Sequence, residues 1–158
     1  MKILLPVDGT ELSLHETRFA LRLLREGLSA SFVLANVQEP ASFYEMVTAQ
    51  DMELIGNAAQ EAGEDLMAAS AQLLQEAGAD FETAVISGDP VQAMLELIEI
   101  HRCDMVVMGS RALSAIRRAF EGGSTSRRLI QDSPVPVLLV KPPAPASDAP
   151  DEAADSNE

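Results

Sequence analysis

A loop rich in glycine, serine and arginine holds the residues of this sequence that are best suited to chemistry. It runs from Gly109-Ser110-Arg111-Ala112 to Gly122-Gly123-Ser124-Thr125. Glycines let backbone amides approach a ligand closely, serine hydroxyls donate hydrogen bonds, and a helix beginning near Gly123 offers unpaired N–H groups and a positive dipole end. These features suit a phosphate group, although a plain connection between a strand and a helix would have the same composition.

Positive charge is concentrated in the same stretch. The chain has 11 lysines and arginines against 25 acids and a formal net charge of −14, so most of its surface repels nucleic acid and anionic lipid. Between positions 111 and 128 the only acid is Glu121, and the basic residues there are Arg111, Arg117, Arg118, Arg127 and Arg128. The distribution predicts an anion-binding locus and no nucleic-acid partner, with a solvated arginine-rich face as the alternative.

The other groups that could do chemistry stand alone. His15 and His101 are the two histidines and Cys103 is the one cysteine, too few for a metal site or for a supported Cys-His nucleophile. Cys103 is interpreted as a small core residue. The sequence contains neither a G-x-S-x-G elbow nor a G-x-x-x-x-G-K-[ST] loop, and Asp8 lacks the clustered acids of a phosphate-accepting receiver domain. We therefore predict no catalytic residue and no metal ligand.

The loop lies within an alternation of short apolar runs and helical patterns. Apolar runs without polar alternation predict strands buried on both faces, at residues 2–7, 30–37, 81–86, 104–108 and 135–140. Helical patterns lie between them, at residues 11–28, 57–77, 91–102 and 123–131, and residues 41–56 have no clear period. Within the first helix, Leu12, His15, Phe19 and Leu23 form the stripe expected to face the sheet.

This order of elements predicts an α/β fold with a single doubly wound, five-stranded parallel sheet and helices on both faces, of the Rossmann-like kind. In such sheets ligands bind beyond the carboxyl ends of the strands. The glycine-rich loop leaves the fourth strand at that edge, so its predicted position agrees with its composition.

The two ends of the chain differ in composition. Residues 142–158 contain proline, alanine and acids but no large apolar side chain, so we expect a disordered acidic tail after a domain at residues 1–141. The apolar run at the start is short and is followed directly by Asp8, unlike a signal peptide. No stretch is long and apolar enough to cross a membrane, and we expect a cytoplasmic protein.

Five blocks of the sequence, in order, resemble the universal stress protein family. They are ILLPVDGTELS, LANVQEP, SGDPVQAMLELI, CDMVVMGSR and GGSTSRRLIQDSPVPVLLVK, and the resemblance covers residues 1–141. It implies a stress-response regulator that binds an adenine nucleotide, ATP in preference to ADP or AMP, with or without Mg²⁺. It also implies a protein partner, which the sequence does not identify.

Carried over position by position, the resemblance implies a nucleotide site made of residues from both halves of the chain. Asp8 would accept hydrogen bonds from the ribose hydroxyls, and Val7 and Val37 would sandwich the purine. The phosphates would lie in the loop that Met108 and Gly109 open. The full implied set is Pro6, Val7, Asp8, Val37, Met108, Gly109, Arg111, Ala112, Gly122, Gly123, Ser124 and Thr125.

The phosphate loop departs from the family signature, which is Gly, two residues, Gly, nine residues, Gly, then Ser or Thr. The second glycine is Ala112 here, and alignment on Gly123-Ser124 makes the loop one residue longer. A methyl group where backbone must touch phosphate costs about 1 kcal/mol or more. Some family members lack the signature and do not bind ATP, so a nucleotide-free protein-interaction module is the alternative function.

A third hypothesis is an enzyme that hydrolyses ATP slowly or phosphorylates itself at Ser124 or Thr125. The sequence offers no general base and no carboxylate pair for a metal, which disfavours fast phosphoryl transfer.

The last apolar run is expected to be the edge strand of the sheet. Long apolar edges are usually paired or protected, and the resemblance implies a homodimer in which this strand pairs with its two-fold mate. The predicted interface residues are Val135, Val137, Leu138, Leu139 and Val140.

Overall fold

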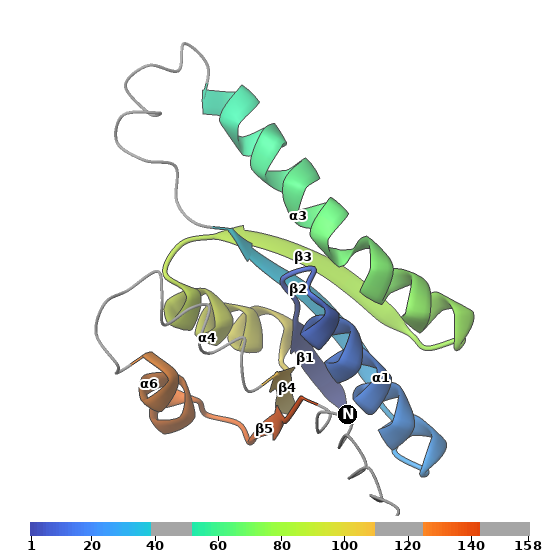
Figure 1. The fold of residues 1–158 in the computed structure, drawn as a ribbon. Helices are drawn as coiled ribbons and strands as arrows, with labels where there is room; N and C mark the ends of the chain where they lie inside the picture. The colour runs from blue at the N-terminus through green and yellow to red at the C-terminus, as the bar shows by residue number, and fades with distance from the viewer. Residues whose placement is uncertain (39–51, 110–124, 143–158) are drawn as a thin grey trace, which may run out of the picture.

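The computed structural model describes residues 1–38, 52–109 and 125–142 of the chain. Within them, a parallel sheet has the strand order β3-β2-β1-β4-β5 (Figure 1). The strands are β1 (Lys2–Pro6), β2 (Ser31–Gln38), β3 (Phe81–Ser87), β4 (Met105–Gly109) and β5 (Val137–Val140). The predicted α/β class and the five-stranded parallel sheet are confirmed. Of the predicted tail, only Pro142 lies among the described residues.

Helices cover both faces of the sheet, as the alternation predicted (Figure 1). They are α1 (Glu11–Arg25), α3 (Met52–Glu76), α4 (Pro90–His101) and α6 (Thr125–Asp132). Side chains of α1 and α3 pack with one set of strand residues, which includes Ile3, Leu5 and Val107. Side chains of α4 and α6 pack with the alternate set, which includes Leu4 and Val106. Alternate strand residues thus pack into two separate cores, one on each face of the sheet. Both sets of side chains are therefore apolar, and the strand sequences are continuous apolar runs.

The first residue of α4 is determined by the local sequence. Asp89 is the N-cap, and its side chain accepts a hydrogen bond of 3.0 Å from the backbone N–H of Gln92. Pro90 occupies the first turn, where its missing N–H would have had no helical partner. The Ser-Gly-Asp-Pro junction therefore fixes where this helix begins.

The face that α1 buries differs from the predicted one. The stripe with His15 is only partly buried, whereas the fully buried residues of the helix are Ser13, Glu16, Thr17 and Ala20. Small and polar side chains face inward because α1 lies close to its neighbours. The Thr17 hydroxyl donates to the Ser13 carbonyl at 2.8 Å, and its oxygen lies within hydrogen-bond distance, 3.0 Å, of Ser70 Oγ of α3. The hydrophobic period identified the helix but not its rotation.

Two element boundaries also differ from expectation. Helix α3 begins at Met52, five residues before the predicted start at Asn57. Strand β5 begins at Val137 rather than Val135, because both backbone groups of Val135 bond to Ser133 Oγ, at 2.7 and 3.3 Å. Pro136 has no N–H to offer to a strand. Val135 therefore belongs to the turn before the edge strand.

Successive strands are added to one side of β1 as far as β3 and to its other side from β4 onward. From β1 the chain runs through α1 to β2 on one side, and from β4 it runs to β5 on the other. The register of β1 with β4 covers Ile3↔Met105 and Leu4↔Val106, while β1 stays paired with β2 as far as Pro6↔Ala35. The carboxyl ends of β1 and β4 thus part at the topological switch point, where open α/β sheets bind ligands.

Candidate functional site

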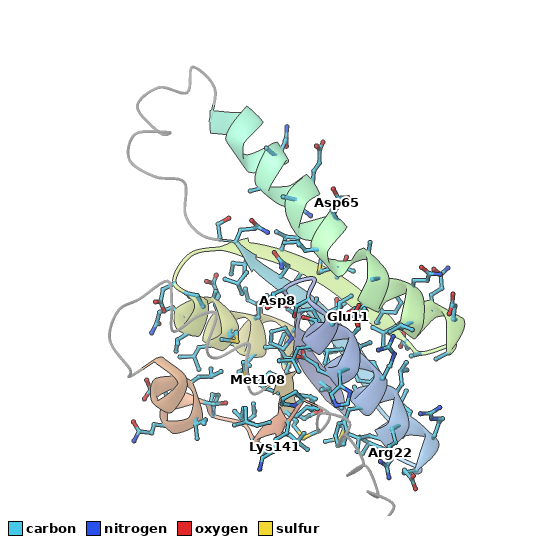
Figure 2. All side chains as sticks on the ribbon, viewed as in Figure 1. Asp8, Glu11, Arg22, Asp65, Met108 and Lys141 are labelled. Atoms are coloured by element: carbon cyan, nitrogen blue, oxygen red, sulfur yellow. The ribbon has the colours of Figure 1, made fainter. Side chains whose placement is uncertain are left out.

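The turn after β1 holds Asp8 in a fixed position at the start of α1, where Figure 2 labels it beside Glu11. Its Oδ1 accepts hydrogen bonds from the backbone N–H of Thr10 at 3.1 Å, from the Thr10 hydroxyl at 2.6 Å and from the Ser13 hydroxyl. The Asp8 N–H in turn donates to Ser13 Oγ at 3.0 Å. These hydrogen bonds fix the orientation of the side chain that was predicted to bind ribose.

Electrostatics keep Asp8 ionised. Partial burial acts to raise the pKa of its carboxyl, but hydrogen bonds from Ser13 and Thr10 outweigh it and hold the pKa below the ordinary value. Among the described residues, no hydrogen bond uses Oδ2. A fixed carboxylate with one unused oxygen can accept from a hydroxyl pair.

Gly9 makes this turn sterically possible. It has a φ of +78°, and a Cβ on it would lie 2.7 Å from Leu66 Cδ2 of α3. A side chain here would be strained by the backbone and would collide with α3. The short passage between Asp8 and α1 therefore depends on glycine.

The end of β2 contributes a buried amide that the sequence analysis missed. Asn36 is 2% exposed, its Nδ2 donates to the Val7 carbonyl at 2.8 Å, and its Oδ1 accepts from Gln38 Nε2 at 2.5 Å. The Val7 N–H also donates to the Ala35 carbonyl at 2.8 Å. A lone asparagine inside the apolar run FVLANV was the available signal, because a buried amide requires partners.

The two valines predicted to enclose a purine lie in different cores. Val7 is 5% exposed and belongs to the core under α1 and α3. Val37 is partly buried and packs against the core under α4. Of the two, Val37 offers side-chain surface at this edge, and Pro6 and Val7 contribute mainly backbone.

The end of β4 is packed tightly against α1. Met108 is fully buried, so its side chain is part of the core. A Cβ on Gly109 would lie 3.0 Å from both Glu16 Oε2 and Leu12 Cγ. The first residue of the predicted phosphate loop is thus a glycine because α1 approaches it so closely.

Glu16 is the second functional group that sequence reasoning missed. Its side chain is fully buried, and its Oε2 accepts a hydrogen bond of 2.6 Å from the Gly109 N–H. Its Oε1 is buried and has no hydrogen-bond partner among the described residues. Burial raises the pKa of Glu16 to about 9, with the Gly109 N–H acting to lower it and the charge of Asp8 acting to raise it further. At neutral pH the site therefore combines an ionised Asp8 with a neutral Glu16.

Most of the predicted phosphate loop lies outside the described residues. This holds for Arg111, Ala112, Gly122, Gly123 and Ser124. Thr125 is the first residue of α6. The described structure thus brings together the ends of β1, β2 and β4, and the phosphate-binding part of the prediction stays a prediction.

Strand β5 is an edge of the sheet, as expected. Leu139 is 38% exposed, Val137 and Leu138 are partly buried, and Val140 is 5% exposed. Within the described ranges, β5 pairs with β4 along one edge and with no strand along the other, and the dimer itself stays a prediction.

Other candidate sites add little to this one. A hollow of about 420 Å³ does not include Asp8 and is lined by residues of α1 and of the end of α3, namely Arg18, Leu21, Leu24, Arg25, Leu73 and the following Ala77. Cys103 is 5% exposed, and burial raises the pKa of its thiol to about 11, as suits a core cysteine. No cluster of three His, Cys, Asp or Glu side chains suited to a metal occurs within the described ranges. No helix within them is long and apolar enough to span a bilayer.

Comparisons with known proteins bear on the family and the fold. Residues 1–141 match the model of the Universal stress protein family. A universal stress protein of Methanocaldococcus jannaschii is 28% identical over 142 residues, which cover 90% of this chain and 82% of that protein.

Two solved structures share the fold. One is a universal stress protein in complex with cAMP, with a TM-score of 0.64, 23% identity and coverage of 89% of this chain and 96% of that one. The other is a universal stress protein family protein of Arabidopsis thaliana with AMP bound, with a TM-score of 0.64, 20% identity and coverage of 93% and 97%.

Proposed function

Because this chain belongs to the universal stress protein family, as its sequence blocks predicted, we propose that it is a stress-response regulator that binds an adenine nucleotide, ATP by preference. The nucleotide lies across the carboxyl ends of β1 and β4. The observation that carries the proposal is Asp8, a carboxylate held by Thr10 and Ser13 where these strands part, with Oδ2 unused by the described residues. The relatives solved with cAMP and AMP support an adenine nucleotide as the ligand class.

Each part of the nucleotide has a counterpart in the proposed site. Asp8 accepts from the ribose hydroxyls, and charge-assisted hydrogen bonds of this kind are strong. Val37 borders the adenine. The phosphates lie against the loop that begins at Gly109 and against the N-terminus of α6 at Thr125, where unpaired N–H groups and the helix dipole favour an anion. Mg²⁺ accompanies ATP through the phosphate oxygens and water.

Equilibrium binding to the purified full chain tests this proposal. We expect ATP to bind, ADP and AMP to bind more weakly, and GTP to bind least, in titrations with and without Mg²⁺. If no adenine nucleotide binds at millimolar concentration, the proposal that this chain binds a nucleotide is wrong.

The second candidate is a nucleotide-free module that works through protein contacts. Ala112, at the second glycine of the family signature, and the longer loop favour it. Substituting Ala112→Gly separates the two candidates. If wild type binds ATP, the variant should bind about fivefold more tightly, since relief of about 1 kcal/mol corresponds to that factor. If only the variant binds, the natural chain is a module that has lost its nucleotide.

We propose no catalytic role for the described residues. Slow hydrolysis of ATP, or autophosphorylation at Ser124 or Thr125, is the enzymatic alternative, and phosphate-release kinetics together with mass spectrometry of the protein after incubation with ATP would reveal either.

We further propose that the protein acts in the cytoplasm as a homodimer joined through β5, with Val137, Leu138, Leu139 and Val140 at the interface and Val135 beside it. An exposed apolar edge strand supports this assembly. A protein partner, still to be identified, would bind the dimer according to whether it holds a nucleotide.

A further inference from the structure

The hollow between α1 and the end of α3 has the size and composition of a ligand site. Its volume is about 420 Å³, within the roughly 300–1,000 Å³ of small-molecule pockets, which are mainly apolar with a few polar groups. Four apolar side chains, three of them leucines, and two arginines line it. The leucines are only partly buried, so a ligand with an apolar chain would remove more of their surface from water.

The lining is arranged as a short groove between two helices. On α1, Arg18, Leu21 and Arg25 are spaced by three and four residues, so their side chains leave the same side of the helix. The two arginines are therefore about 10 Å apart along the helix axis. Leu73 and the exposed Ala77, four residues apart, form the other wall. The groove thus has an apolar lining and two cations along one wall.

No described residue neutralises these two arginines. The ion pair within α1 joins Arg22 to Glu26 at 3.7 Å, and Arg18 and Arg25 take part in no ion pair among the described residues. Both side chains are exposed, so their guanidinium groups are accessible to a ligand. A planar guanidinium pairs with a carboxylate through two parallel hydrogen bonds. On a chain of net charge −14, this groove is complementary to an anion.

Larger or more polar ligands fit the groove poorly. A stable protein interface uses about 20–30 residues on each side, far more than the residues that line the groove. Nucleic acids bind through many phosphate contacts, and only two cations are present in the lining. The lining side chains include no hydrogen-bond acceptor, so they do not match the amino group of a purine.

We propose that this groove binds a fatty-acid carboxylate. A single alkyl chain lies against the leucines of α1 and α3, and the carboxylate pairs with Arg18 and Arg25. The site shares no residue with the proposed nucleotide site. Asp8 precedes α1 and Arg25 is the last of its 15 residues, so the two sites lie towards opposite ends of a helix about 22 Å long.

Octanoate is the probe, and 1-octanol is the control with the same chain and no charge. Binding to the full chain is followed through the methyl resonances of Leu21, Leu24 and Leu73. We expect saturable shifts at these leucines and an affinity for octanoate about fivefold higher than for 1-octanol, the factor that an exposed ion pair contributes. Equal affinities would overturn the proposal, as would equal shifts at Ile100 and Leu139, exposed apolar residues of other elements.

Charge variants test the role of the arginines. The double variant Arg18→Gln and Arg25→Gln should bind octanoate about fivefold more weakly and bind 1-octanol as wild type does. Arg22→Gln, which changes the arginine paired with Glu26, should bind octanoate as wild type does. Equal losses in the double variant and in Arg22→Gln would refute recognition by the lining arginines.

A pair of variants at Ala77 controls for effects on folding. Ala77 is exposed and lines the groove. Ala77→Lys should tighten octanoate binding and Ala77→Glu should weaken it, each by about two- to fivefold. Damage to the fold would weaken binding in both variants, so changes of the same sign would contradict the proposal.

The acidic end of this chain is the competing occupant, since residues 143–158 contain five acids. A variant with Asp148→Asn, Asp151→Asn, Glu152→Gln and Asp155→Asn keeps the length of this segment and removes most of its charge. At physiological ionic strength, wild-type affinity of this variant for octanoate would support a groove open to the ligand. Binding several-fold tighter than wild type would assign the groove to the acidic segment and overturn the proposal.

Discussion

The backbone N–H of Gly109 donates to Glu16 Oε2 across 2.6 Å, joining the end of β4 to α1 over a separation of 93 residues. This contact fixes the peptide that opens the predicted phosphate loop, and it explains why the residue at the end of β4 carries no side chain. Four predictions follow from this contact, from Asp8 and from the free edge of the sheet.

The stability of the protein should depend on pH through Glu16. Between about pH 4.5 and pH 9, the folded protein keeps the Glu16 proton that the unfolded chain has lost. Stability therefore falls as pH rises through this range, by at most about 1.4 kcal/mol per pH unit from this group. Glu16→Gln removes the dependence, so its unfolding free energy relative to wild type should increase with pH in urea titrations. A constant difference between the two proteins from pH 5 to pH 9 would contradict the neutral acid.

Replacing Gly109 with alanine should destabilise the protein. The new Cβ would lie 3.0 Å from Glu16 Oε2 and from Leu12 Cγ, and overpacking of this kind costs about 1–3 kcal/mol. The matched control is Gly56→Ala in α3, where nothing lies within 4 Å of the added Cβ and the helix should gain about 0.5–1 kcal/mol. Chemical denaturation of both variants measures the contrast, and equal effects would show that α1 does not press on Gly109.

Asp8→Asn should weaken ATP binding by roughly ten- to a hundredfold, because hydrogen bonds to a charged group contribute about 1.5–3 kcal/mol. The low pKa of Asp8 keeps the carboxyl ionised, so wild-type affinity should not change through loss of this charge until the pH falls below the ordinary range of aspartate. Asp65→Asn removes an exposed carboxylate from α3 and serves as the control in the same calorimetric titration. Undiminished affinity of Asp8→Asn would remove the ribose contact from the proposed site.

A charge on the edge strand should produce monomers. Leu139→Asp alters the most exposed apolar residue of β5, and Val137→Asp alters a partly buried one, so the first separates assembly from stability more cleanly. Sedimentation velocity should show a dimer for wild type and a monomer for both variants. Ile100→Asp, on a side chain of α4 that is 62% exposed, should leave the dimer intact. Dimers that persist with Leu139→Asp would place the interface elsewhere.

The architecture could be predicted from the sequence because its signals are local. Short apolar runs identify strands buried on both faces, and the Asp89-Pro90 pair marks the start of α4 within one residue. Asp8 follows the first strand directly, but its role in the proposed site is implied by the family resemblance and stays a prediction. The family resemblance added the ligand class, and the comparisons confirm the family.

Asn36 offered one local signal, an asparagine inside an apolar run, but Glu16 could not be found in this way. A glutamate in a helix is ordinarily exposed, and its burial here depends on how α1 is rotated and on Gly109, a partner remote in sequence. The rotation is set by packing of small residues such as Ser13 and Thr17 against the sheet and α3. The hydrophobic period favoured a different stripe.

The pairing of β1 with β4 has a consequence for the order in which the protein matures. The register of β1 with β4 begins at Ile3↔Met105, so this central contact can form only after β4 has been synthesised. Closing so long a loop is also a slow step in folding. We expect chains that lack β4 to leave Glu16 exposed and ionised, since its contact with the Gly109 N–H is then missing, so that capacity for the ligand is acquired only once β4 has paired with β1.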